Sequence, residues 1–376
     1  MKLVYVANSI IPSRAANSVH VMKMCDALAS VGYEVTLLVP AVSESDQRDL
    51  FESYGVPRSF TIKRLPWVKM PGRGWWFALL AFLAIRRLKA DRVYGRHLPS
   101  LMLPSMAGIP TAYEAHAPVW ETMGKPGMAC FRLVACGRGF RKLVVISDAL
   151  AGWYVRHTML GENNILVAHD AASPSPNSVM KLGGQRTEGR FELGYVGQLY
   201  TGKGMEMIAA VAQRRPSYAF TVVGGDDADI DYWSGRLRNL GNIRFTGFLP
   251  QAEAVSLIEG FDAVLAPYQK RVTTAGGGGD VSRWMSPLKI FEYMAAGKPI
   301  VASDLPVLQE VLDDGENALL CEPENPDHWC GAIDRLYSET GLGERLGSQA
   351  RSDFLEHYTW GARACRVLKD VYGDAY

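Results

Sequence analysis

Short apolar runs alternate with amphipathic stretches along the first half of the chain. Apolar runs separated by segments with helical spacing predict parallel strands joined by right-handed crossovers. The first expected helix covers residues 16–32. The expected strands are 2–7, 34–39, 91–95, 110–116 and 142–147. This pattern predicts a doubly wound α/β domain, similar to the Rossmann fold, over residues 1–172.

A second series of the same kind predicts another doubly wound domain over residues 190–358. Residues 173–189 are rich in Ser, Pro and Gly without periodicity, so we expect a linker there. Residues 359–376 are expected to form a helix that packs back on the first domain. The expected strands are 191–199, 219–225, 242–249, 262–268, 299–303 and 317–323. Two such domains facing each other across a cleft would bring their ligand-binding strand ends together.

Composition narrows the class of protein. A chain of 376 residues with 48% hydrophobic and 21% charged residues fits a soluble two-domain enzyme. The formal charge of +1 argues against a dedicated nucleic-acid binder. Six cysteines without a C-x-x-C pair suggest reduced thiols in a cytoplasm, and the first ten residues turn polar too soon for a signal peptide. A dehydrogenase is disfavoured because the turn at 7–18 lacks glycine.

The stretch "SPLKIFEYMAAGKPIVAS", residues 286–303, predicts a short helix followed by a buried strand. Ser286 and Pro287 suit a helix start, with serine as the cap and proline in the first helical position. Gly297 suits the helix end, and the apolar run that follows suits a strand buried on both faces.

Two charged residues interrupt this otherwise apolar helix. Lys289 and Glu292 are three residues apart and therefore share a face. Lys289 in the first turn would strengthen an anion site at the helix N-terminus, and Glu292 would accept hydrogen bonds from sugar hydroxyls. An exposed salt bridge between them is the alternative.

The segment "GYVGQLYTGKGMEM" carries a lysine between two glycines. A strand is expected to end at Gly197 and a helix to begin after Gly204, with Lys203 in the turn beside Gly202. Glycines let backbone approach a ligand closely, and a lysine there neutralises a pyrophosphate. A structural turn with a solvated lysine would have a similar sequence.

The segment "AYEAHAP", residues 112–118, places Glu114 and His116 at a strand end, which is the functional edge of such a sheet. A structural histidine remains an alternative. The acidic stretch 224–231 resembles a metal-binding cluster, but we interpret it as the cap of the next helix. No metal ligand is therefore assigned.

Residues 75–89 combine apolar and basic side chains. Trp75, Trp76 and Phe77 would enter the headgroup boundary of a membrane, and Arg86, Arg87 and Lys89 would pair with anionic lipid. A buried core helix is the alternative. The apolar run is too short to span a bilayer. Docking on anionic lipid would place the protein at the inner face of the cell membrane.

Five segments, taken in order, resemble glycosyltransferase family four, the retaining, nucleotide-sugar-dependent enzymes with the GT-B fold. They are "ANSVHVMKMCDALASVGYEV", "YGRH", "YEAHAP", "GQLYTGKG" and "SPLKIFEYMAAGKPIVAS", and they run over nearly the whole chain. The last resembles the branch with an SPLK-x-x-EYMA-x-G motif. The resemblance implies that the second domain binds the nucleotide sugar and the first binds the acceptor.

The resemblance also implies roles for individual residues. Lys203 would hold the donor pyrophosphate, Glu292 the ribose hydroxyls and His116 the donor sugar near the reacting carbon. The remaining donor contacts would come from Gly197, Gln198, Gly202, Ser286, Pro287, Leu288 and Lys289. The acceptor side would include Asn17, Ser18, Arg96 and Glu114.

The sequence departs from the family pattern at two positions. Many members have a second glutamate eight residues before the one matching Glu292, where this chain has Trp284. Many have an arginine where this chain has Gln198. The contacts of those groups must be absent or supplied otherwise, with Lys289 and backbone amides as candidates.

We therefore expect a retaining hexosyltransferase that uses a nucleoside diphosphate sugar and no metal or other cofactor. The expected acceptor is a sugar hydroxyl of a glycan, lipid-linked, in the synthesis of cell-surface polysaccharide or glycoconjugate. An epimerase or phosphorylase of the same architecture and a non-catalytic nucleotide-sugar-binding protein are the alternatives.

Overall fold

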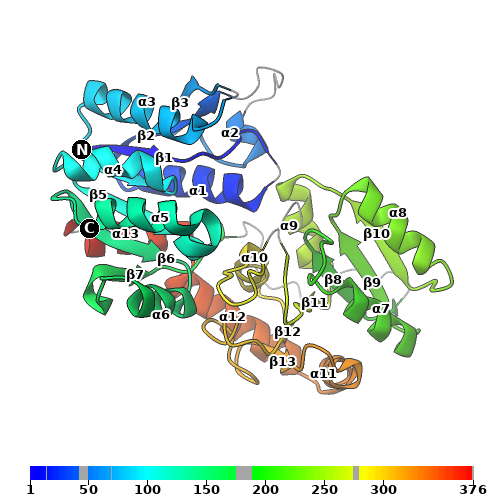
Figure 1. Ribbon diagram of the computed structural model, residues 1–376. Helices are drawn as coiled ribbons and strands as arrows, with labels where there is room; N and C mark the ends of the chain where they lie inside the picture. Colours follow the sequence, from blue (N-terminus) through cyan, green and yellow to red (C-terminus); the bar gives the residue numbers. More distant parts are fainter. Residues whose placement is uncertain (14, 42–49, 69, 175–188, 274–278, 375–376) are drawn as a thin grey trace. The chain divides into compact units, whose positions relative to one another are not determined.

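The computed structural model describes residues 1–376 except 14, 42–49, 69, 175–188, 274–278 and 375–376 (Figure 1). The chain forms two compact units. One comprises Met1–Asp170 with Trp360–Tyr376, and the other comprises Ala171–Thr359. Most of the expected linker, 173–189, lies outside the described residues.

The first unit is built on a parallel sheet of seven strands in the order β3-β2-β1-β4-β5-β6-β7. The strands are β1 Lys2–Val6, β2 Glu34–Ala41, β3 Thr61–Pro66, β4 Arg92–Gly95, β5 Thr111–Ala115, β6 Phe140–Val145 and β7 Ile165–Val167. The predicted doubly wound architecture is confirmed. Only the two edge strands were not predicted, because most side chains of β3 are exposed and β7 has three residues.

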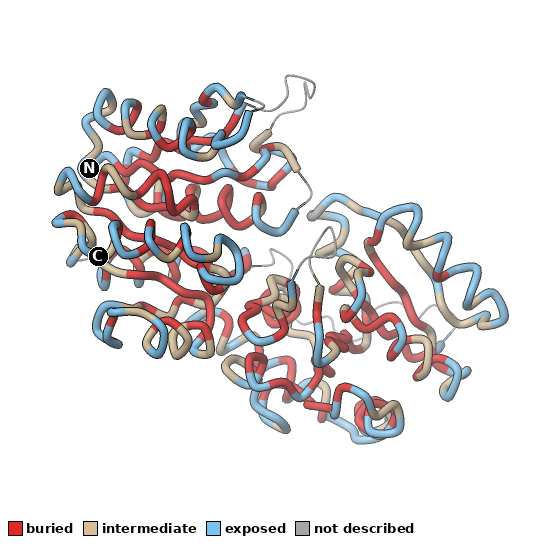
Figure 2. Tube along the Cα trace, in the orientation of Figure 1, coloured by how far each residue is buried: buried red, intermediate tan, exposed pale blue. Residues whose placement is uncertain are grey.

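The helices of this unit cover the central strands, which are buried. The outer faces of the helices are exposed (Figure 2). They are α1 Ala16–Ser30, α2 Leu50–Ser53, α3 Arg73–Leu88, α4 Leu98–Met106, α5 Val119–Ala135, α6 Asp148–His157, the 3₁₀ turn Glu162–Asn164 and α13 Trp360–Tyr372. The near-continuous apolar strands β1 and β2 are those expected of a sheet covered on both faces.

The C-terminal helix α13 belongs to the first unit and packs against α1, β6 and β7. Its last turn is fixed by polar contacts: Arg92 Nη2 lies 2.5 Å from Asp374 Oδ1, and the Tyr372 hydroxyl donates to the Val93 carbonyl at 2.8 Å. The helix therefore forms part of this fold although it follows the second unit in sequence.

The second unit is a parallel sheet of six strands in the order β10-β9-β8-β11-β12-β13. The strands are β8 Glu192–Val196, β9 Ala219–Val223, β10 Ile243–Gly247, β11 Ala263–Ala266, β12 Ile300–Ser303 and β13 Leu319–Cys321. The helices are α7 Met205–Arg214, α8 Asp227–Arg236, α9 Gln251–Gly260, α10 Leu288–Ala295, α11 Pro326–Ser338 and α12 Leu342–His357. All six predicted strands are present.

One helix start differs from the prediction. Helix α10 begins at Leu288, with Pro287 in the cap position, because the backbone of Pro287 is still extended at ψ 120°. Gly297 has φ +64° directly after the helix end, as the predicted stop requires.

In each sheet the strand order reverses at one point, between β1 and β4 in the first unit and between β8 and β11 in the second. Doubly wound sheets bind ligands outside the carboxyl ends of the strands near such points. The loops at these strand ends are therefore where functional side chains are expected.

Candidate functional site

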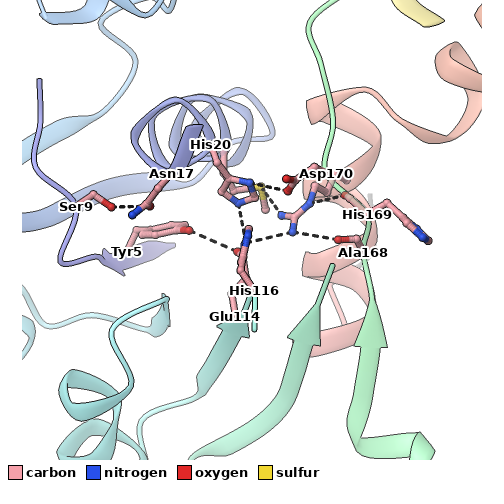
Figure 3. A network of polar contacts seen from close by, with 11 residues as sticks. Tyr5, Ser9, Asn17, His20, Glu114, His116, Ala168, His169 and Asp170 are labelled. Atoms are coloured by element: carbon pink, nitrogen blue, oxygen red, sulfur yellow. Dashed lines mark hydrogen bonds and ion pairs between the residues drawn. The ribbon is translucent and has the colours of Figure 1, made fainter. Parts of the chain in front are cut away.

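The carboxyl end of β5 carries a fully buried carboxylate. Glu114 Oε1 lies 2.6 Å from His116 Nε2 and 2.7 Å from His20 Nε2 (Figure 3). The same oxygen lies 3.3 Å from Arg363 Nη2, and the Tyr5 hydroxyl donates to Oε2 at 3.4 Å. Burial opposes ionisation, but the interactions with His20 and Arg363 outweigh it and hold the pKa of Glu114 well below its usual value.

His20, on the buried face of α1, links this carboxylate to a second one. Its Nδ1 lies 2.8 Å from Asp170 Oδ1, in the segment after β7. Its ring meets the rings of His116 and Trp360 edge-on, at 4.8 Å and 5.1 Å between centroids. Burial would raise the pKa of Asp170, but His20 outweighs it and the pKa is lowered. Each ring nitrogen of His20 thus faces a carboxylate oxygen.

His116 is the member of this group with partial exposure: one fifth of its side chain is accessible. Burial, together with repulsion from Arg96, lowers its pKa from 6.5 to about 4, although Glu114 acts in the opposite direction. The imidazole is therefore neutral at about pH 7. Because Nε2 is directed at the Glu114 carboxylate, it carries the proton, and Nδ1 is the ring nitrogen that accepts.

Arg363 reaches this group from α13. Besides Glu114, it donates from Nε to the His169 carbonyl at 2.9 Å and from Nη2 to the Ala168 carbonyl at 3.2 Å. The side chain is almost fully buried, and the pKa of the guanidinium is nevertheless raised, because Glu114 outweighs the burial. The network thus joins residues that are far apart in the sequence.

The remaining acceptor-side residues lie on the same unit. Asn17 is exposed and accepts a hydrogen bond from the Ser9 hydroxyl at 2.8 Å, whereas Ser18 is buried and donates to the Ile10 carbonyl at 2.9 Å. Ser18 therefore fixes the loop after β1. Arg96, directly after β4, keeps Nη1 buried with no hydrogen-bond partner among the described residues. Its charge reaches His116, as the lowered pKa shows.

In the second unit, Lys289 lies beside the end of β8. Its Nζ is 3.6 Å from the centre of the Tyr195 ring and 5.2 Å from that of Tyr268. A Cβ on Gly197, which has φ +147°, would come within 2.8 Å of this nitrogen, so glycine is required there. Burial, then repulsion from Lys203, lowers the pKa of Lys289 far below its usual value.

Lys289 is buried, so the alternative of an exposed salt bridge with Glu292 is wrong. Within the described part of the chain, the Nζ atom has no hydrogen-bond partner. The half-buried Glu292 favours the charged form of Lys289, but burial and Lys203 outweigh it. The Lys289 nitrogen therefore lies near the faces of two aromatic rings, where cation–π contacts favour its charged form.

Lys203 approaches the same aromatic surface from the loop before α7, with Nζ 5.1 Å from the centre of the Tyr268 ring. Burial lowers its pKa to about 8. The loop is tied to the one after β11, since Gln269 N–H donates to the Gly202 carbonyl at 3.0 Å. A Cβ on Gly202 would meet the Arg271 carbonyl oxygen at 2.0 Å, so the two loops pack closely.

The other predicted donor residues surround these lysines. The Gln198 carbonyl accepts from the Tyr195 hydroxyl at 2.7 Å. Ser286 is buried, Pro287 is the N-cap of α10 and Leu288 is its first residue. Tyr293 on α10 accepts from Val196 N–H at 2.8 Å, which fixes this helix beside β8.

The acidic stretch 224–231 begins α8. Asp226 caps this helix by accepting from Asp229 N–H at 2.9 Å, as predicted. A different group offers three metal-ligand atoms within 4.8 Å of one another: His20, His116 and Asp170. Their facing atoms already contact one another or Glu114, as described above.

Helix α3 has one buried and one exposed face. Phe77 is fully buried, so its predicted insertion into a membrane together with Trp75 and Trp76 is wrong. The exposed apolar residues are Trp75, Trp76, Leu79 and Leu83. No helix in the described ranges has the length and apolar character needed to cross a bilayer.

A groove of about 550 Å³ lies between α5 and α6 and includes none of the predicted site residues. Trp153 stacks on His157 at 4.7 Å, and Trp120 is half exposed. Neighbouring Tyr154 donates to the Ala117 carbonyl at 3.2 Å, beside His116. The groove is lined by Trp120, Lys125, Met128, Ala129, Arg132, Trp153 and His157.

Sequence reasoning missed His20, Asp170 and Arg363 in the first unit. His20 falls within a predicted helix, and the other two lie far from it in the chain, so spacing gives no signal for them. Tyr195 and Tyr268, which hold the lysines, were likewise predicted only as parts of strands.

Two family models match the chain, one in each unit. Residues 18–171 match the model described as Glycosyltransferase Family 4, and residues 190–339 match Glycosyl transferases group 1. The first match contains His20, Glu114, His116 and Asp170, and the second contains both lysines.

Relatives match either nearly the whole chain or about half of it. The phosphatidyl-myo-inositol mannosyltransferase of Mycolicibacterium smegmatis is 24% identical over 93% of this chain and 88% of its own. A D-inositol 3-phosphate glycosyltransferase of Corynebacterium diphtheriae is 27% identical over 49% of this chain and 42% of its own.

Solved structures share the fold. Sucrose-phosphate synthase from Thermosynechococcus elongatus has a TM-score of 0.73 at 16% identity, over 97% of this chain and 96% of the other. Anabaena Alr3699/HepE in complex with UDP has a TM-score of 0.73 at 17% identity, over 100% of both chains. With the two family models, these findings show that the chain belongs to the family-four type of glycosyltransferases and has the GT-B fold.

Proposed function

We propose that this glycosyltransferase moves a hexosyl group from a nucleoside diphosphate sugar to a sugar hydroxyl, with retention of the anomeric configuration. The observation that carries the proposal is the pair Lys203 and Lys289, whose Nζ atoms lie 5.1 Å and 5.2 Å from the centre of the Tyr268 ring, beside the ends of β8 and β11. For Lys289, burial and the other ammonium both disfavour its charge. A bound pyrophosphate would offset both effects.

The same pair supplies the chemistry that the reaction needs. Negative charge develops on the leaving pyrophosphate as the glycosidic bond breaks, and preorganised cations in a partly buried site stabilise it. Glu292 binds the ribose hydroxyls, and His116 binds a sugar hydroxyl through Nδ1. The leaving phosphate helps to deprotonate the acceptor on the same face of the sugar, which gives retention.

We also propose that transfer requires no metal ion. Lys203 and Lys289 supply the positive charge that a divalent cation would otherwise supply. Asp226 is engaged as a helix cap, which supports a structural role for the acidic stretch.

The proposed acceptor is a lipid-linked glycan for cell-surface polysaccharide or glycoconjugate, reached at the inner face of the membrane. Its support is helix α3, whose exposed Trp75 and Trp76 lie on a helix with Arg86 and Arg87 in its last turn. Aromatic and basic side chains together bind interfaces with anionic lipid. The aromatic and basic groove between α5 and α6 offers a further surface for the glycan.

The test is incubation of the protein with a panel of nucleoside diphosphate sugars and glycan acceptors, followed by NMR of the product anomeric proton. A disaccharide linkage with the donor's configuration supports the proposal. Inversion would contradict retention. A free altered sugar would instead favour an epimerase or phosphorylase, and donor binding without turnover would favour a nucleotide-sugar sensor.

A further inference from the structure

The C-terminal helix α13 supplies two residues to the buried group around His116. Arg363 contacts Glu114, and the ring of Trp360 meets His20 edge-on at 5.1 Å. Both side chains are buried, and they come from the other end of the chain. Docking of a terminal helix would require only apolar contacts. Burial of a guanidinium is unfavourable unless hydrogen bonds and an opposite charge compensate for it.

The partners of Arg363 are two backbone carbonyls and one carboxylate that serves His116. Two other nitrogens, from His20 and His116, converge on the same Glu114 oxygen. His20 and Arg363 together outweigh the effect of burial and keep Glu114 ionised, so Glu114 accepts the His116 N–H. Glu114 in turn decides which nitrogen of His116 carries the proton.

We propose that Arg363 and His20 are positioning residues that act through Glu114 to hold His116 neutral, with the proton on Nε2 and Nδ1 turned to a substrate hydroxyl. The C-terminal helix is then part of the functional machinery of the first unit. The contact of Nδ1 with a substrate hydroxyl rests on the function proposed above. The protonation state of the His116 ring does not.

Several charged groups raise or lower the pKa of His116. Arg96, which follows β4, lowers its pKa, whereas Glu114 on β5 and Asp170 after β7 raise it. The ring of His20 from α1 packs against it, and Arg363 from α13 offsets the charge of Glu114. Loss of Arg363 would leave the negative charge of Glu114 less compensated and would raise the pKa of His116 from about 4.

The first experiment is NMR of the intact wild-type protein labelled with ¹⁵N-histidine, at about pH 7. We expect His116, assigned by comparison with His116→Gln, to carry its proton on Nε2 and to have a bare Nδ1. A proton on Nδ1 with a bare Nε2, or a doubly protonated ring, would overturn the proposal. This measurement is independent of turnover and holds even if no transfer activity is found.

The second experiment compares Arg363→Met and Arg363→Lys with Arg366→Met, an exposed arginine on the same helix. We expect Arg363→Met to lower kcat roughly 10- to 100-fold with little change in donor KM, the size expected for a misplaced group. Its acid limb of kcat/KM should move from about pH 4 towards neutral pH, whereas Arg363→Lys and Arg366→Met should keep the wild-type limb.

A further control separates positioning from helix docking. Asp374→Asn loosens the far end of α13 from Arg92 without touching the network. We expect it to lower Tm but to leave the acid limb in place. The proposal would be contradicted if the acid limb did not move in Arg363→Met. It would also be contradicted if the limb moved equally in Asp374→Asn, because Arg363 would then have only a structural role. If Arg363→Met does not fold, a shifted limb in His20→Asn supports the proposal and an unshifted one contradicts it.

Discussion

Lys289 Nζ lies 3.6 Å from the centre of the Tyr195 ring, in a buried position where the described residues offer it no hydrogen-bond partner. The ring face gives some electrostatic compensation, but a buried ammonium without an anion remains costly. Lys289 lies beside the point where the second sheet changes strand order, which is where α/β proteins bind ligands. The fold therefore keeps an unfavourable buried amine at a position suited to a ligand.

The first prediction concerns Lys289→Met. A thioether of similar length removes the buried charge, so we expect an unchanged or higher Tm without ligand. Affinity for nucleoside diphosphates should fall roughly 10- to 100-fold, the value of a charge-assisted hydrogen bond. Thermal unfolding and calorimetric titration measure the two effects separately. Lys298→Met, at the other end of α10, is the matched control and should leave affinity unchanged.

The second prediction concerns pH. Burial lowers the pKa of Lys203 to about 8, and an anion would raise it again, so ligand binding takes up a proton above about pH 8. Affinity for a nucleoside diphosphate should therefore fall as pH rises above about 8, by up to about tenfold per pH unit for one proton. Lys203→Met should weaken this dependence, and Lys289 would account for what remains; a wild-type affinity that stays flat up to about pH 10 would contradict the assignment.

The third prediction concerns catalysis by Lys203. Lys203→Ala should lower kcat roughly 10²-fold, because one preorganised donor to a developing negative charge typically contributes that much. Glu292→Gln should mainly raise the donor KM, since ribose contacts exist in the ground and transition states alike. Steady-state kinetics with the donor found by screening distinguish the two. A near-normal kcat in Lys203→Ala would indicate that this lysine is only a solvated residue of a structural turn.

The fourth prediction concerns metal ions. Activity should persist after treatment with EDTA and removal of the chelator by gel filtration, because the two lysines supply the positive charge. Activity that disappears and returns only with Mg²⁺ or Mn²⁺ would argue against metal-independent transfer. The group His20, His116 and Asp170 would then be the first site to test by substitution.

The fifth prediction concerns membrane docking. Sedimentation with anionic liposomes should fall with added salt and should be lost in Arg86→Glu/Arg87→Glu. Trp75→Ser/Trp76→Ser should fold normally, because both tryptophans are nearly half exposed, and should also lose binding. Arg138→Glu/Arg141→Glu makes the same charge change at exposed positions elsewhere in the first unit. Equal loss in that control, or no sedimentation at low salt, would contradict a specific role for α3.

The fold could be predicted from sequence wherever strands are apolar on both faces. The run from Pro299 to Ser303 gave β12 almost to the residue, and Gly297 marked the end of α10. Strand β3 was missed because it lies at a sheet edge and its exposed side chains remove the apolar signal. The start of α10 was placed one residue early, since helix ends depend on backbone geometry that residue types only suggest.

The site could be predicted only in part. Lys203, Lys289 and His116 lie in short segments whose glycines and strand ends reveal them. His20 meets Glu114 through tertiary packing, and Arg363 reaches it from 249 residues further along the chain. The lowered pKa values of the two lysines are also invisible in sequence, because they depend on what surrounds Nζ.

We propose that Lys203 and Lys289 together hold the diphosphate of the donor. Thermal unfolding of the wild type and of Lys203→Met/Lys289→Met, each with a panel of nucleoside diphosphates, tests it most directly. At about 100 times its dissociation constant, the preferred diphosphate should stabilise the wild type by roughly 2.7 kcal/mol. This stabilisation should disappear in the folded double variant. Equal stabilisation of both proteins, or none of the wild type by any nucleoside diphosphate, would contradict it.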